Sequence, residues 1–240
     1  MEARILKWKE LAKKRSSTLP ALDVIRHESN QAVANQRHAD QIAARLKIIP
    51  VRFRGKSFDD YKIEIPLQKR AKMVAEKFVE TFSKRLQEGT VLHFLGKPGT
   101  GKTFLSLLMY QSIVKNGFSA QYEPSTQFLK VLQEKRFESN AAYRSLLNHY
   151  RQIDFLILDE ITESITKNGQ LADVERALLL DVINARYEEK HRCTLIISNR
   201  DKSELNERLG NRIYDRLSEN SLTLAFNWNS YRQHKEKTCY

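Results

Sequence analysis

Cysteine is scarce in this sequence of 240 residues, which holds only Cys193 and Cys239. Neither has a partner at the spacing of a metal site, and a disulfide-stabilised scaffold needs more cysteines. Long apolar runs are also lacking, because no stretch reaches the about 18 apolar residues typical of a membrane-spanning helix. The first residues are charged, and no apolar stretch with a cleavage site follows them. These absences argue against a secreted or membrane-spanning protein and favour the reducing cytoplasm.

Acidic residues are too few to balance the basic ones. Lys and Arg total 41 against 29 Asp and Glu, which gives a formal net charge of +12. This surplus favours a polyanionic partner such as nucleic acid, although many basic proteins bind no specific polyanion. The 41% of hydrophobic residues suffices for the core of one full-sized domain with a small appendage.

Three parts follow one another along the chain. Residues 1–47 have a helical pattern with few large apolar side chains, so they bury little surface by themselves. Residues 48–65 contain Pro, Gly and clustered charge, which predicts a linker, and the aromatic residues Phe53, Phe58 and Tyr61 could anchor it. From residue 66 to 240, amphipathic helices alternate with short apolar strands.

This last part is predicted to be one α/β domain. The expected strands are residues 91–95, 119–123, 154–158, 194–198 and 222–226. The expected helices include residues 67–87, 171–189 and 204–218 and a helix that begins at Lys102. Near-continuous apolar strands that alternate with helices are typical of a parallel sheet covered on both faces. We therefore predict a five-stranded parallel sheet flanked by helices.

The segment GKPGTGKT, residues 96–103, fits the phosphate-loop motif G-x-x-x-x-G-K-[ST]. It follows an apolar strand and opens a helix, which disfavours an incidental glycine-rich turn. Its glycines allow a tight turn whose N–H groups, with the helix N-terminus, face the β-phosphate of a nucleotide. Lys102 is predicted to reach the β- and γ-phosphates, and the Thr103 hydroxyl to bind Mg²⁺. The predicted nucleotide-binding residues here are Gly96, Pro98, Gly99, Thr100, Gly101, Lys102 and Thr103.

Polar side chains end the next two apolar strands. DFLILDE ends at Asp159 and Glu160, at the sheet edge where the phosphates are expected. We predict that Asp159 holds Mg²⁺ and the nucleotide, and that Glu160 orients and deprotonates the attacking water. The Asn199 amide of TLIISNR is predicted to position the same water. An isolated Asp-Glu pair would be a solvated strand end, but the upstream phosphate loop favours ATP hydrolysis.

Three arginines, Arg208, Arg212 and Arg216, are spaced by four residues in NERLGNRIYDRL. In one helix they share a face, where they repel one another unless an anion or an acidic partner lies opposite. The alternative is a solvated or DNA-facing stripe.

The order of these motifs is that of the AAA+ ATPases, which the chain resembles from about residue 66 to its end. Within that superfamily, the phosphate loop, the run RLGNRIYDRL and the segment FNWNSYR at residues 226–232 resemble DnaC-type loaders of the replicative helicase. The resemblance implies that Asn199 is a sensor, that Arg232 is a second sensor touching the nucleotide, and that Arg216 is an arginine finger. Such a finger enters a neighbouring subunit's ATP site and stabilises charge on the transferred phosphoryl group. Arg212 remains the alternative finger.

The resemblance also implies partners. DnaC-type loaders hold the hexameric replicative helicase through their N-terminal region, which here is residues 1–47, and bind single-stranded DNA through the ATPase domain. Self-association through the ATPase domain with ATP bound, and weak hydrolysis stimulated by DNA and partner, are expected. Because 14 residues follow Phe226, we expect no C-terminal lid domain and no helix-turn-helix DNA reader.

Two segments are candidates for contact with DNA. The first carries Lys135, Arg136 and Phe137, since cationic grooves with exposed aromatic rings bind single strands. Its alternative is an amphipathic helix with Phe137 in the core. The second is the loop after Glu160, which carries Thr166 and Lys167.

Two other functions stay open, and a third is disfavoured. An IstB-type transposition helper, an ATPase that delivers duplex DNA to a transposase, has a similar linker. A nucleotide-gated adaptor without enzymatic activity would use the N-terminal helices as its functional part. A metabolic kinase is disfavoured, because we find no lid or acceptor pocket in the sequence.

Overall fold

The computed structural model describes residues 42–161 and 173–232. The chain divides into two compact units, residues 1–48 and 49–240. In the first unit the described part is helical at residues 42–46. The second unit contains residues 49–65 of the predicted linker and the predicted α/β domain. The candidate DNA-binding residues Thr166 and Lys167 and most of the predicted N-terminal region lie outside the described residues.

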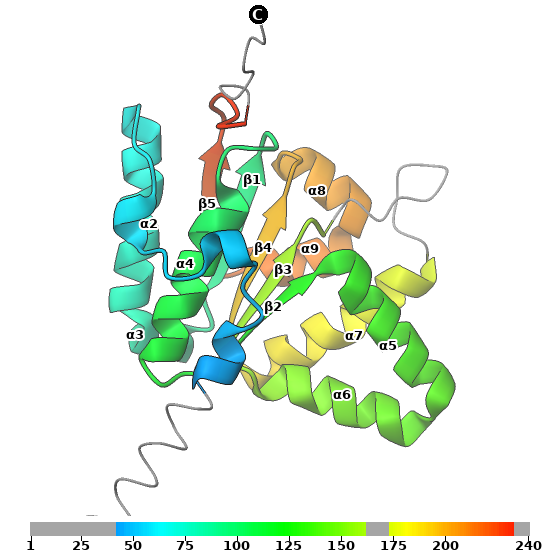
Figure 1. The fold of residues 1–240 in the computed structure, drawn as a ribbon. Coiled ribbons are helices and arrows are strands. Elements are labelled where there is room, and N and C mark those ends of the chain that lie inside the picture. The colour runs from blue at the N-terminus through cyan, green and yellow to red at the C-terminus, as the bar shows by residue number, and fades with distance from the viewer. Residues whose placement is uncertain (1–41, 162–172, 233–240) are drawn as a thin grey trace, which may run out of the picture. The chain divides into compact units, whose positions relative to one another are not determined.

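A five-stranded sheet forms the centre of the second unit, with the strand order β2-β3-β4-β1-β5 (Figure 1). All neighbouring strands are parallel. The strands are β1 (Val91–Gly96), β2 (Ala120–Pro124), β3 (Phe155–Asp159), β4 (Cys193–Ser198) and β5 (Ser221–Phe226). Each predicted strand is confirmed to within one residue at either end.

Helices cover both faces of this sheet. They are α2 (Pro66–Glu80), α3 (Phe82–Glu88), α4 (Lys102–Lys115), α5 (Ser125–Glu138), α6 (Asn140–Gln152), α7 (Asp173–Glu189), α8 (Lys202–Leu209) and α9 (Asn211–Ser218). Helices α2, α3 and α4 lie on one face, and α5 to α9 lie on the other (Figure 1). Two short 3-10 helices, η1 (Val51–Phe53) and η2 (Phe58–Asp60), precede α2. Within the described ranges, no helix is both long and apolar enough to cross a membrane.

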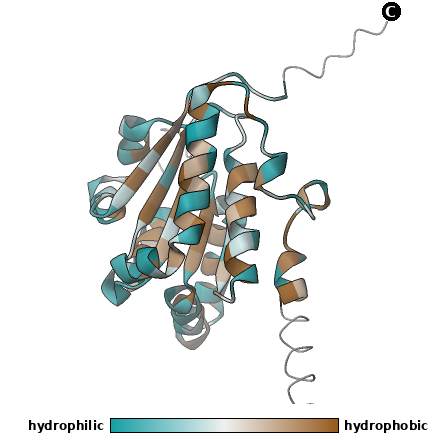
Figure 2. Ribbon diagram, turned by 90° about the vertical axis from the view of Figure 1, so that its left-hand side faces the viewer, coloured by the Kyte–Doolittle hydropathy of each residue, from teal (hydrophilic) through white to brown (hydrophobic). Residues whose placement is uncertain are grey.

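The core explains why the central strands are mostly apolar. Every residue of β3 and β4 is buried, because helices exclude water from both sides. Figure 2, which faces the side of α2 and α4, shows hydrophobic strands behind helices of mixed hydropathy. On this side Phe82 packs against Phe118, with ring centroids 4.8 Å apart, and against Phe78 at 5.8 Å. Phe78 and Phe82 also contact Phe155 of β3, with ring centroids 5.7 and 5.8 Å apart, so these rings hold α2 and α3 against the sheet.

Two predicted helices are each divided in the structure. The helix expected over residues 67–87 breaks at Thr81, whose hydroxyl donates to the Lys77 carbonyl at 2.7 Å. The helix expected over residues 204–218 breaks at Gly210, whose φ of 81° is a conformation that glycine adopts readily. The turn at Gly210 ends α8 and starts α9.

The division at Gly210 changes the arrangement of the three arginines. Arg208 belongs to α8, whereas Arg212 and Arg216 belong to α9. The prediction that all three share one helical face is therefore wrong. A spacing of four residues aligns side chains only within an uninterrupted helix.

Candidate nucleotide site

The predicted phosphate loop connects the buried strand β1 to α4. Gly99 and Gly101 have φ angles of 77° and 89°, in the left-handed region that favours glycine. The first helical residue of α4 is Lys102, so the N-terminus of a 14-residue helix opens at the loop. The N–H groups of its first turn and its dipole favour a bound anion such as phosphate.

The FNWNSYR segment, near the C-terminal end of the sequence, is hydrogen-bonded to this loop. The Tyr231 N–H donates to the Gly99 carbonyl at 2.9 Å, and the Trp228 indole N–H donates to the Thr100 carbonyl at 3.1 Å. A Cβ on Gly99 would lie 1.9 Å from Ser230 Oγ. No motif in the sequence predicts this role of Trp228, Ser230 and Tyr231, and Arg232 is the residue of this segment that was expected at the site.

Lys102 points into the loop that it follows. Its side chain is buried, and its Nζ donates to the carbonyls of Gly96 and Lys97, both at 2.6 Å. These contacts hold the ammonium group beside the turn. Its position there suits a group that neutralises phosphate oxygens.

Asp159 ends β3 next to Thr103. The Thr103 hydroxyl donates to Asp159 Oδ2 at 2.8 Å, and the Tyr122 hydroxyl donates to the same oxygen at 2.7 Å. Burial raises the pKa of Asp159, and the hydroxyls of Tyr122 and Thr103 counteract this effect. The other oxygen, Oδ1, is buried and has no hydrogen-bond partner among the described residues. A hydroxyl beside an incompletely satisfied carboxylate fits Mg²⁺, which prefers oxygen ligands.

Glu160 follows Asp159 with a φ of 58°, a conformation uncommon for residues other than glycine. It is exposed, whereas Asp159 is buried. The two neighbouring carboxylates thus have different environments at the same edge of the sheet. This difference suits the predicted separation of metal binding from base chemistry.

A cavity of about 570 Å³ brings most of the predicted site residues together. Its lining includes the predicted residues Pro98, Gly99, Gly101, Lys102, Thr103, Asp159, Glu160, Asn199 and Arg232. Gly96 and Thr100 do not line it. Gly96 lies behind the loop with its carbonyl on Lys102, and Thr100 is fully buried with its hydroxyl on the Lys97 carbonyl at 2.8 Å.

Aromatic rings form another part of this cavity. Phe53 and Tyr61 come from the predicted linker, and Phe104 directly follows the phosphate loop. The Phe104 ring stacks on Phe53 at 5.1 Å and on Tyr61 at 6.3 Å, and Tyr231 meets Tyr61 edge-on at 6.4 Å. The sequence identified Phe53 and Tyr61 only as possible anchors, and it gave no role to Phe104.

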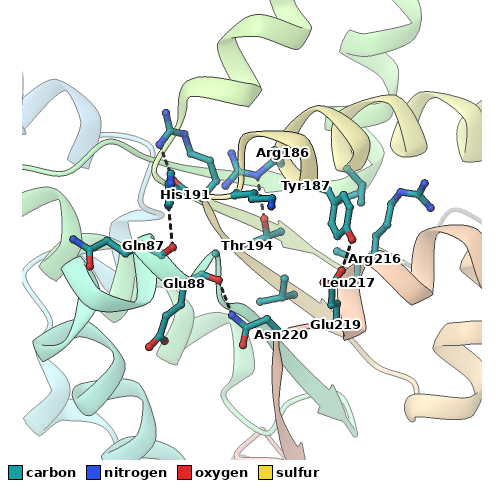
Figure 3. A pocket seen from close by; sticks show the side chains of 15 residues that line it. Gln87, Glu88, Arg186, Tyr187, His191, Thr194, Arg216, Leu217, Glu219 and Asn220 are labelled. Atoms are coloured by element: carbon teal, nitrogen blue, oxygen red, sulfur yellow. Dashed lines mark hydrogen bonds between the residues drawn. The ribbon is translucent and has the colours of Figure 1, made fainter.

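Arg216 lies elsewhere, in a separate cavity of about 330 Å³ (Figure 3). This cavity includes Val91 at the start of β1, so it lies at the amino ends of the strands rather than at their carboxyl ends. The Arg216 guanidinium is 5.7 Å from the Tyr187 ring centroid, and its Nη1 donates to the Arg212 carbonyl at 2.8 Å. The Tyr187 hydroxyl in turn donates to Glu219. Arg216 is therefore not part of its own subunit's nucleotide cavity.

The candidate DNA-binding residues of α5 are placed at its C-terminal end. Lys135 pairs with Glu138 at 2.5 Å, and Arg136 lies 5.7 Å from the Tyr143 ring centroid. Phe137 is 81% exposed, so the alternative that placed it in the core is wrong. Leu132 is fully buried, and the five residues of helix from Leu132 to Phe137 turn Phe137 to a different side.

A comparison with protein families matches residues 6–239 to the IstB-like ATP binding proteins. The chain belongs to this family. Two curated relatives are replicative helicase loaders named DnaC. The loader of Escherichia coli (strain K12) is 30% identical over 182 residues, which cover 73% of this chain and 69% of the relative. The loader of Buchnera aphidicola subsp. Acyrthosiphon pisum is 31% identical over 183 residues, which cover 74% and 70%.

A solved structure supports the fold. The crystal structure of the DnaC helicase loader matches with a TM-score of 0.64 and 24% identity, over 73% of this chain and 99% of that chain. The predicted AAA+ architecture and the resemblance to the DnaC and IstB-like family are thereby confirmed. The roles of individual site residues stay predictions.

Proposed function

We propose that this protein is an ATP-dependent loader that binds the hexameric replicative helicase and delivers it onto single-stranded DNA in the cytoplasm. The observation that carries the proposal is the packing of FNWNSYR on the phosphate loop through Trp228 and Tyr231. Both segments resemble those of DnaC-type loaders, and here they form one cavity. The homology to DnaC supports the replication partner.

The cavity supports ATP hydrolysis by a simple division of roles. The loop N–H groups and Lys102 hold the β- and γ-phosphates, while the aromatic rings offer a surface for the base. Thr103 and Asp159 hold Mg²⁺, which neutralises charge on the phosphate oxygens when bound. The exposed carboxylate of Glu160 accepts a proton from the attacking water, and the Asn199 amide orients it.

Contacts with other molecules complete the proposal. Arg216 lies outside the nucleotide cavity of its own subunit and acts on the nucleotide of a neighbouring subunit. Arg232 acts on the nucleotide of its own subunit. Residues 1–47 hold the helicase, and hydrolysis releases the loader. The exposed Phe137 with Lys135 and Arg136 offers a stacking and cationic surface to single-stranded DNA. Thr166 and Lys167 stay a proposed second contact.

The variant Glu160→Gln tests the chemistry. It keeps the shape of the site but removes the proton acceptor, so we expect ATP binding like the wild type and hydrolysis slower by about a hundredfold or more. Glu80→Gln, which alters an exposed carboxylate at the end of α2, is the matched control. Turnover of Glu160→Gln at the wild-type rate would contradict the mechanism.

The loader role is tested by retention of the host's replicative helicase on the immobilised full chain. A chain lacking residues 1–41 should bind ATP but lose the helicase. The family also favours a second candidate, the IstB-type transposition helper. Preference for duplex over single-stranded DNA, with no helicase retained, would favour that function. Helicase binding without any ATP hydrolysis, even with DNA present, would instead indicate a nucleotide-gated adaptor.

A further inference from the structure

Tyr122, a residue of β2 outside the sequence motifs, contacts the proposed metal-binding carboxylate. Its hydroxyl donates to Asp159 Oδ2 at 2.7 Å, and it lines the nucleotide cavity. The Thr103 hydroxyl donates to the same oxygen at 2.8 Å. Oδ2 therefore accepts two hydrogen bonds from neutral donors, which are strong when the acceptor is ionised.

A third hydrogen bond holds the main chain of Asp159. The Ser125 hydroxyl donates to the Asp159 carbonyl at 2.6 Å, and Ser125 is 1% exposed. Tyr122 and Ser125 lie on either side of the junction between β2 and α5. This junction thus restrains both the carboxylate and the backbone of Asp159.

The two oxygens of Asp159 have different surroundings. Oδ2 has two donors, while Oδ1 is buried with no hydrogen-bond partner within the described ranges. A carboxylate that rotates freely would exchange these two oxygens. With Tyr122 and Thr103 both bonded to Oδ2, the carboxylate keeps one orientation and Oδ1 remains available.

We propose that Tyr122 is a positioning residue for divalent-cation binding, because it fixes the Asp159 carboxylate with Oδ1 free for Mg²⁺ or for a water molecule of its shell. This inference rests on the proposed ATPase function and extends it to a residue that the motifs do not include. Groups that orient a metal ligand typically change metal affinity by about ten- to a hundredfold when they are removed. Tyr122 acts through Asp159 and does not itself bind the metal.

The test compares ATP binding with and without Mg²⁺. The Tyr122→Phe variant of the full chain is titrated with a fluorescent ATP analogue, first in EDTA and then at increasing Mg²⁺ concentration. We expect the Mg²⁺ concentration for half-maximal enhancement of binding to rise about tenfold, the lower end for groups that orient metal ligands. Affinity in EDTA should stay within about twofold of the wild type, since the phosphate loop is unchanged.

Tyr143→Phe is the matched control. The Tyr143 hydroxyl also donates to a carboxylate at 2.7 Å, that of Asp181, and this residue does not line the nucleotide cavity. Its Mg²⁺ requirement should equal that of the wild type. An unchanged Mg²⁺ requirement in Tyr122→Phe, or an equal loss of ATP affinity with and without Mg²⁺, would overturn the inference.

The failure of the proposed function would look different. In that case the wild type itself would show no Mg²⁺-dependent ATP binding. If the wild type binds Mg²⁺ and ATP together while Tyr122→Phe behaves identically, only the role of Tyr122 is refuted. Thermal unfolding of each variant shows whether it is folded before titration.

Discussion

The side chain of Lys102 is held in place by the phosphate loop itself. Its ammonium donates hydrogen bonds to two uncharged loop carbonyls, those of Gly96 and Lys97. The positive charge is therefore not neutralised by these two contacts. An arriving phosphate would supply the anionic oxygens that the carbonyls lack, so phosphate binding should depend on the Lys102 charge.

Lys102→Ala should abolish measurable ATP binding while leaving the fold intact. The change removes the charge proposed to face the β- and γ-phosphates but no large apolar contact. Lys97→Ala, in the same loop but with an exposed side chain, is the control and should bind ATP like the wild type. Both can be followed by titration with a fluorescent ATP analogue, and thermal unfolding checks the fold. Normal ATP affinity of Lys102→Ala would contradict the proposed site.

His93 is a buried residue that should make the free energy of unfolding depend on pH. It lies fully buried in β1, and neither ring nitrogen has a hydrogen-bond partner among the residues described. Burial, and to a lesser extent the charge of Lys202, lower the pKa of His93 to about 4. In the unfolded chain this pKa is about 6.5, so between these values the unfolded state binds more protons.

The free energy of unfolding should therefore fall as the pH drops from about 6.5 toward 4, by up to about 1.4 kcal/mol per pH unit from His93. Urea unfolding at pH 7, 6 and 5 measures this slope. His93→Leu replaces the ring with an apolar side chain that cannot be protonated, so its slope over the same range should be smaller. Equal slopes for the two proteins would rule out His93 as the cause.

At the level of elements, the contact between the phosphate loop and FNWNSYR depends on the small size of Gly99. Its left-handed φ favours glycine, and Ser230 occupies the space that a Cβ would take. Gly117 has a similar φ of 89°, but nothing lies within 4 Å of the position of its Cβ. The two positions separate backbone strain from steric contact.

Gly99→Ala should destabilise the domain more than Gly117→Ala. The second change carries only the left-handed backbone penalty of about 1–2 kcal/mol, whereas the first adds displacement of Ser230. Urea unfolding gives both values. The double variant Gly99→Ala with Ser230→Gly should recover part of the loss. Equal destabilisation by the two single changes would mean that displacing Ser230 costs no free energy.

Sequence patterns predict the elements better than they predict their contacts. The apolar run of β3 and the motif around Lys102 carry local signals, because burial on both faces and phosphate binding each demand a characteristic sequence. The bond from Trp228 to Thr100 joins residues 128 positions apart, and that from Tyr122 to Asp159 joins residues 37 apart. Such pairs leave no periodic trace. Gly210 was visible in the sequence, but a single glycine does not reveal whether a helix ends there.

On the scale of the whole molecule, the two cavities lie at opposite ends of the strands. The nucleotide cavity contains Asp159 at the end of β3, while Arg216 lies in the cavity that includes the start of β1. Within one subunit, Arg216 therefore does not reach the nucleotide cavity. A site that needs both must be formed by two copies of the chain.

Mixing two inactive variants tests this arrangement. Lys102→Ala lacks the proposed phosphate contact and Arg216→Ala lacks the proposed finger, so each alone should hydrolyse ATP poorly. In a mixture, an Arg216→Ala subunit with an intact loop can lie next to a Lys102→Ala subunit with an intact finger. We expect hydrolysis above that of either variant alone. The same mixture with Arg212→Ala distinguishes the two candidate fingers, and no gain with either would argue against a shared site.

The indole of Trp228 also gives the domain an intrinsic fluorescent reporter of the phosphate loop. Trp228 is 5% exposed with its N–H on the loop carbonyl of Thr100, and the only other tryptophan of the chain is Trp8. A Trp8→Phe chain would therefore carry a single emitting indole, hydrogen-bonded to the loop that is expected to close around phosphate. Its emission maximum and quenching by iodide would report the filling and emptying of the loop during turnover, without any attached dye.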